Sequence, residues 1–115
     1  MFFAAGPMEA ALSNKAFGFE VPTDKQRAIG YGSIDDVLNA LEQAVSQTEY
    51  IAGDRFTAAD VYVGSQIGWG MMFGTIEKRP AFADYFARLQ ARPAAIRANQ
   101  LDDALMPQQA EPQPA

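Results

Sequence analysis

The residue types that usually carry acid–base, nucleophilic and metal chemistry are scarce in this chain. It has no histidine and no cysteine among its 115 residues. The usual general base, the commonest metal ligand and a thiolate nucleophile are therefore absent, and a Ser-His-Asp triad is excluded within the chain. The adjacent pairs Asp35-Asp36 and Asp102-Asp103 do not face each other on a helix, so we interpret them as solvated or capping residues. The sequence predicts no catalytic residue, no metal site and no bound cofactor.

Trp69 is the one residue whose type and setting point to ligand binding. It lies on a stripe at helical spacing that also contains Tyr62, Gln66 and Phe73. Aromatic stripes usually form core, and that is one interpretation. The other is that Trp69 forms the wall of an apolar pocket, because Gly68 and Gly70 remove side chains on either side of its ring.

Composition limits the classes of protein that the chain can represent. Hydrophobic residues make up 49% of it and the net charge is −5, which predicts one globular domain without the basic surface that nucleic acids require. The uncharged run 61–76 is shorter than the ~20 residues of a membrane span. The N-terminus has no basic region before its apolar residues, so it is a poor signal peptide, and a cytoplasmic location is the default.

Hydrophobic periodicity predicts an all-α domain of about five helices over residues 1–106. A first helix over residues 2 to about 18 contains Pro7, which either kinks it or begins its second part. This helix starts without a capping residue, which suggests that its first turns lie upstream of the chain. Thr23 is expected to cap a helix from Asp24; either Ser33 caps a restart or this helix runs through, and an apolar stripe follows over 34–45. Pro80 and Pro93 each fit the first turn of a further helix. The segment 107–115 is rich in Pro, Gln and Ala and is predicted to be a disordered tail.

The helix over 58–73 is expected to be central, because it carries no charge after Asp60 and is apolar or small on every side. Thr57 and Asp60 have the spacing of a capping box, in which each side chain pairs with the backbone N–H of the other residue. Phe56 and Val61 can form a hydrophobic staple around it. We therefore expect a buried cap with a structural role. Two GxxxG patterns, beginning at Gly64 and Gly70, predict close packing of this helix against another.

The order of these elements resembles a known family. The segment YIAGDRFTAADVYV opens the glycine-rich helix, and KRPAFADYFARLQARPAAIRA follows it. Together with the aromatic-rich first helix, they resemble the all-α C-terminal domain of a bacterial glutathione S-transferase over residues 1 to about 105. The most specific parts of this resemblance are the residues 53–60 and 92–94.

The resemblance implies a function that is divided between two domains. In this family a thioredoxin-like domain holds glutathione and activates its thiol, and the helical domain supplies most of the apolar co-substrate site. By position, Gly6, Glu9 and Ala10 on the first helix and Trp69 on the central helix would face that cleft. Glu9 is acidic and Ala10 is inert, so neither is expected to contact glutathione directly. Thr57 and Asp60 match the family's structural cap.

Two functional hypotheses follow. In the first, the chain is the substrate-site half of a cytoplasmic, homodimeric detoxification enzyme, with glutathione as co-substrate and an apolar electrophile as substrate. In this hypothesis the chain alone, which lacks the thioredoxin-like half, is inactive. In the second, the chain is a non-enzymatic helical module that binds apolar ligands or protein partners.

Overall fold

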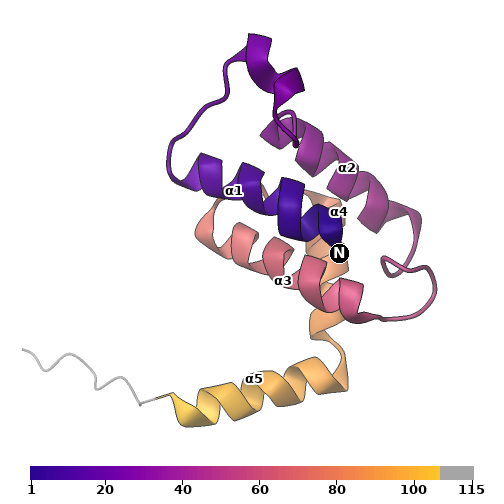
Figure 1. The fold of residues 1–115 in the computed structure, drawn as a ribbon. Helices are drawn as coiled ribbons and strands as arrows, with labels where there is room; N and C mark the ends of the chain where they lie inside the picture. The colour runs from indigo at the N-terminus through magenta and orange to yellow at the C-terminus, as the bar shows by residue number, and fades with distance from the viewer. Residues whose placement is uncertain (107–115) are drawn as a thin grey trace, which may run out of the picture.

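A computed structural model describes residues 1–106, which form a bundle of helices (Figure 1). A π-helical turn, Ala4–Met8, leads directly into α1, Glu9–Ala16, and a short 3-10 helix spans Thr23–Ala28. The longer helices that follow are α2 (Ile34–Gln47), α3 (Ala58–Phe73), α4 (Pro80–Gln90) and α5 (Pro93–Leu105). Residues 1–106 contain no β-strand, only an isolated bridge between Tyr50 and Gly53. The predicted all-α fold is confirmed, whereas the predicted tail at 107–115 lies outside the described residues.

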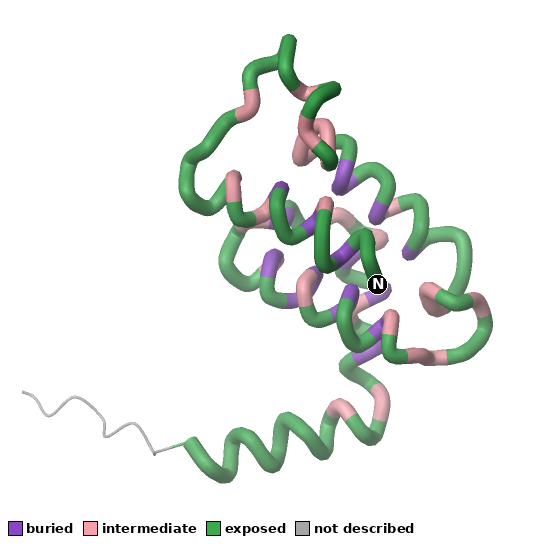
Figure 2. The backbone as a smooth tube through the Cα atoms, in the orientation of Figure 1, coloured by how far each residue is buried: buried purple, intermediate pink, exposed green. Residues whose placement is uncertain are grey.

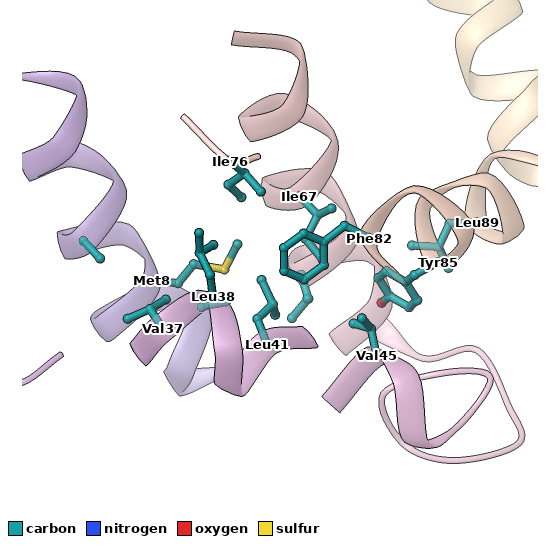
Figure 3. Close-up of a cluster of buried hydrophobic side chains, with 13 residues drawn as sticks. Met8, Val37, Leu38, Leu41, Val45, Ile67, Ile76, Phe82, Tyr85 and Leu89 are labelled. Atoms are coloured by element: carbon teal, nitrogen blue, oxygen red, sulfur yellow. The ribbon is translucent and has the colours of Figure 1, made fainter. Parts of the chain in front are cut away.

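The core lies where α1 to α4 converge, and the buried positions of each helix point toward it (Figure 2). The apolar stripe predicted for the second long helix forms the buried face of α2. The buried side chains that Figure 3 labels are Met8, Val37, Leu38, Leu41, Val45, Ile67, Ile76, Phe82, Tyr85 and Leu89. Burial of such side chains removes about 25 cal/mol of unfavourable hydration per Å² of apolar surface, so this cluster holds the four helices together.

The helix starts follow local chemistry in the way the sequence predicts at three places. The Ser33 hydroxyl accepts a hydrogen bond from the Asp36 N–H at 3.1 Å and caps α2. Pro80 and Pro93 occupy the first turn of α4 and α5, where a missing N–H costs no hydrogen bond. Thr23 is different, because it is the first residue of the 3-10 helix and Pro22 takes the cap position. The prediction of a Thr23 cap was therefore wrong.

Pro7 does not break the first helix. The backbone widens into the π-helical turn Ala4–Met8 around it and continues into α1. An α-helical turn there would drive the proline ring into the carbonyl of Phe3, four residues earlier, and the wider turn relieves that clash. Ala4, Met8 and Ala11 still point into the core, as the predicted stripe requires.

The central helix α3 is buried on one side and exposed on the other, so the expectation of a central, buried helix holds for one side only. Its buried side carries the glycines. A Cβ atom at Gly64 would overlap the Leu89 side chain of α4, and one at Gly68 would overlap the Phe86 ring. These glycines let α3 and α4 approach closely, which confirms the prediction of close helix packing for the pattern that begins at Gly64. The pattern that begins at Gly70 does not face another helix, because a Cβ atom at Gly70 would meet Ile76 after α3 and one at Gly74 would meet no atom within 4 Å, so the prediction was wrong there. Since the glycine side takes the contact with α4, the aromatic side chains of α3 turn outward, and Trp69 is 60% exposed.

The last helix, α5, extends away from the rest of the bundle (Figure 1) and has no buried residue. It is joined to the bundle at its start, where the Arg92 guanidinium stacks 3.2 Å from the centroid of the Phe56 ring. Its apolar residues Ile96, Leu101 and Leu105 are exposed. α5 therefore contributes little to the core that positions the other helices.

Candidate ligand groove between the first and central helices

An open groove of about 380 Å³ runs between α1 and α3. Glu9 of α1 and Trp69 of α3 both line it, so the structure brings together two of the four residues that the sequence placed at the cleft. Gly6 and Ala10 are exposed on the first helix but do not line the groove. The remaining lining residues are Leu12, Ser13, Ala16, Gln66, Gly70, Phe73 and Thr75.

An exposed aromatic pair dominates the α3 side of the groove. The Trp69 and Phe73 rings stack with their centroids 5.3 Å apart and their planes at 28°. Both are mostly exposed, at 60% and 67%. The core interpretation of the aromatic stripe was thus wrong for Trp69, and the pocket interpretation fits its position. Stacked rings that are open to solvent offer a flat surface on which an apolar ligand can lose its hydration.

Two hydrogen bonds between distant segments hold the walls of the groove. The Gln66 amide Nε2 donates to the Ala4 carbonyl at 3.1 Å and ties α3 to the π-helical turn. The Lys15 ammonium donates to the Thr75 carbonyl at 3.0 Å and ties the end of α1 to the segment after α3. The Gln66 amide is oriented by this contact, because only its nitrogen can donate to a carbonyl. Its buried Oε1 has no hydrogen-bond partner within residues 1–106.

The start of α3 is fixed by a separate, buried network around Asp60. The Asp60 carboxylate is 0% exposed and accepts hydrogen bonds from the Ile51 N–H (2.9 Å), the Thr57 N–H (3.0 Å) and the Tyr85 hydroxyl (2.7 Å). The Thr57 hydroxyl stands in the capping-box position, but the Asp60 N–H donates to the Thr57 carbonyl at 3.0 Å. The Thr57 hydroxyl has no partner in the described part of the chain. Asp60 therefore joins the loop before α3, the α3 N-terminus and α4, which is a structural role.

Burial, and then the hydrogen bond to the negatively charged Asp60, raise the pKa of the Tyr85 phenol above its usual value of 10.0. The folded chain therefore keeps the Tyr85 proton in a pH range where the unfolded chain releases it. This group leaves stability unchanged below about pH 10 and destabilises the fold as the pH rises further, by up to about 1.4 kcal/mol per pH unit.

Tyr85→Phe removes this titration and gives a direct test. Urea midpoints of the parent and of Tyr85→Phe, measured between about pH 8 and about pH 11, are expected to converge as the pH rises, because only the parent has this source of alkaline destabilisation. A difference in unfolding free energy that stays constant over that range would show that the Tyr85 proton is not held as described.

A second hollow lies on the other side of α1 and is lined by different residues. It has a volume of about 470 Å³ and lies between α1 and the segment 18–34. The Asn14 amide donates to the Tyr31 hydroxyl across it at 2.9 Å, and no pair of exposed stacked rings lines it. Because the α1–α3 groove is more apolar and carries the exposed aromatic pair, it is the better candidate for an apolar ligand.

Neither a candidate metal site nor a membrane-spanning helix is found within residues 1–106. No group of three or more acidic side chains within residues 1–106 is arranged to hold a metal ion. No helix in that range is both long and apolar enough to cross a bilayer.

Comparison with protein-family models matches residues 8–93 to the glutathione S-transferase C-terminal domain. The chain belongs to this family. The match covers the interval from Met8 in the π-helical turn to Pro93 at the start of α5, so it includes α1, α3 and the groove between them. Searches of curated proteins and of solved structures returned no match. The fold of this glutathione S-transferase C-terminal domain agrees with the all-α architecture that the sequence resemblance implied.

Several residues that line the groove were not predicted from the sequence. Leu12, Ser13 and Ala16 follow Glu9 at helical spacing, and that periodicity is the signal that could have extended the site along α1. Gln66 and Phe73 belong to the aromatic stripe, but the sequence did not show that this stripe faces α1. Thr75 lies beyond the end of α3, and no local pattern marks it.

Proposed function

We propose that this glutathione S-transferase C-terminal domain supplies the apolar co-substrate site of a transferase, and that the α1–α3 groove is that site. The observation that carries the proposal is the exposed, stacked Trp69–Phe73 pair in a groove whose surface is mainly apolar. Joined to a thioredoxin-like domain, the groove would hold an electrophilic apolar compound while the glutathione thiolate attacks it. A cytoplasmic homodimer with a detoxifying role is the form of this activity that we propose.

The chain by itself is not expected to conjugate glutathione. An enzyme accelerates attack by a thiol at neutral pH by placing a donor or a base that lowers the thiol pKa, and the chain has no histidine to do so. The Tyr85 hydroxyl is buried and donates to Asp60, so it cannot serve as that donor. Incubation of the purified chain with glutathione and an aryl halide should give the uncatalysed rate. A faster rate that survives repurification would contradict this expectation.

A second candidate function rests on apolar side chains that are exposed outside the groove lining. Phe2 is 95% exposed at the start of the first helix, and Met72 is 73% exposed on α3. Exposed apolar surface of this kind is typical of a face that another protein surface covers. A thioredoxin-like domain would cover it in the transferase, whereas a different protein partner would cover it in a non-enzymatic module.

Titration of Trp69 fluorescence with a hydrophobic dye tests the groove directly, because the chain contains one tryptophan. We expect saturable quenching by the dye, and Trp69→Phe should remove this signal while the dye's own fluorescence still reports binding. Leu12→Gln should weaken binding, because Leu12 lines the groove on α1. Leu101→Gln, an equal change at an exposed position of α5 outside the groove, is the matched control and should leave binding unchanged. Equal effects of the two leucine variants would contradict the placement of the site.

A further inference from the structure

The groove is lined by one acidic residue and by no basic residue. Among its nine lining residues, Glu9 is the single ionisable one. No salt bridge joins Glu9 to a cation within residues 1–106, where the ion pairs found are those of Arg79. Lys15 lies on the same helix, but six residues correspond to about 9 Å along the axis, and its ammonium is directed to the Thr75 carbonyl. Glu9 thus lines a groove of mainly apolar surface and has no salt-bridge partner within residues 1–106.

The aromatic wall of the groove also favours positively charged ligands, as Glu9 does. The face of an indole ring carries partial negative charge and attracts cations that lie within about 6 Å of its centre. Trp69 lines the groove together with Glu9, and Phe73 extends the aromatic surface. A carboxylate and a tryptophan face in one groove are the two groups that proteins combine to hold organic cations.

The charged group of the groove residues is also an acceptor. Glu9 is exposed and carries two carboxylate oxygens. An ammonium group brings N–H donors and no acceptor, so it complements these oxygens. A carboxylate brings acceptors alone and would be repelled, all the more because the whole chain has a net charge of −5.

We propose that the α1–α3 groove selects apolar aryl compounds that carry a positively charged amine, with Glu9 as the charge partner and Trp69 as the aromatic platform. This inference rests on the proposed function of the groove as an apolar ligand site and names the class of ligand. Because the Glu9 side chain is exposed, its attraction is screened by water, and we expect a preference of about threefold to tenfold over a neutral ligand of the same shape.

The test uses three ligands that share a biphenyl ring and carry an aminomethyl, a hydroxymethyl or a carboxylate group. Their affinities are read from the chemical shift of the Trp69 indole N–H in the full chain labelled with ¹⁵N. The amine is expected to bind best and the carboxylate worst. Added salt should reduce the difference, because it screens the Glu9 charge. Glu9→Gln should bring the amine to within about twofold of the alcohol.

Glu20→Gln is the matched control, because it makes the same change in net charge at an exposed residue that does not line the groove. It should keep the preference for the amine. If Glu20→Gln and Glu9→Gln have equal effects, the preference reflects the acidity of the whole chain and the proposal fails. Equal affinities of the amine and the alcohol for the parent would also overturn it while leaving the apolar groove intact. If not even the neutral alcohol moves the Trp69 signal, the proposed function of the groove fails as well.

Discussion

Replacement of Asp60 by alanine is expected to lower the free energy of unfolding by about 3–5 kcal/mol, the largest effect among the substitutions considered. The carboxylate is completely buried and accepts hydrogen bonds from Ile51, Thr57 and Tyr85. Alanine would leave all three donors, one buried and two part-buried, without this partner, and each unpaired buried donor costs about 1–3 kcal/mol. Urea denaturation followed by circular dichroism measures the loss.

Two further variants distinguish the loss of the Asp60 hydrogen bonds from the general effect of removing a negative charge. Asp84→Ala removes an exposed carboxylate from α4 and should change stability by no more than about 0.5 kcal/mol. Asp60→Asn keeps the shape and one acceptor oxygen, so its loss should lie between those of the two alanine variants. A loss below about 0.5 kcal/mol for Asp60→Ala would mean that the α3 N-terminus is not buried as described.

Gly70→Ala is expected to destabilise the fold by about 2–3 kcal/mol, although alanine is the better helix former. A Cβ atom at position 70 would lie 2.5 Å from the Cδ1 and Cγ1 atoms of Ile76 and 3.0 Å from its Cβ. Ile76 is 1% exposed, and its N–H donates to the Gly70 carbonyl at 3.0 Å, so it has no room to withdraw. The added methyl must push the chain after α3 away from the core.

Gly6→Ala is the matched control for this prediction. It makes the same chemical change on a helical glycine whose Cβ would meet no atom within 4 Å. The change should be neutral or stabilise the fold by up to about 1 kcal/mol, because alanine loses less backbone entropy than glycine. Gly70→Ala should therefore lower the thermal midpoint, whereas Gly6→Ala should leave it unchanged or raise it. A stabilised Gly70→Ala variant would show that α3 and Ile76 are not in close contact.

Features that depend on local chemistry could be predicted from the sequence. The apolar stripe of α2, the Ser33 cap and the two prolines that open α4 and α5 each involve residues within a few positions of one another. The role of Asp60 was predicted for the same reason, since Thr57 lies three residues away. Its bonds to Ile51 and Tyr85 were not predicted, because they depend on how the preceding loop and α4 fold over the carboxylate.

The orientation of α3 could not be predicted. Its residues are apolar or small on every side, so hydrophobic periodicity does not indicate which side faces the core. The glycine face becomes the buried face only because Leu89 and Phe86 of α4 occupy the space beside it. Trp69 is exposed as a consequence of that packing. The placement of Glu9 and Trp69 at one groove was implied by the family resemblance rather than by spacing, since they lie on different helices. The bond from Gln66 to the Ala4 carbonyl likewise arises from the contact between helices.

Chemical-shift mapping of an apolar ligand on the ¹⁵N-labelled chain tests the central claim, that the α1–α3 groove is the ligand site. Titration with a neutral aryl compound is predicted to move the backbone signals of Leu12, Ser13 and Gly70 together with the Trp69 indole signal. Signals of Phe19 and Gln26, in the hollow on the other side of α1, should stay unchanged. Shifts that cluster at Phe19 and Gln26, with the Trp69 indole signal unmoved, would contradict the account.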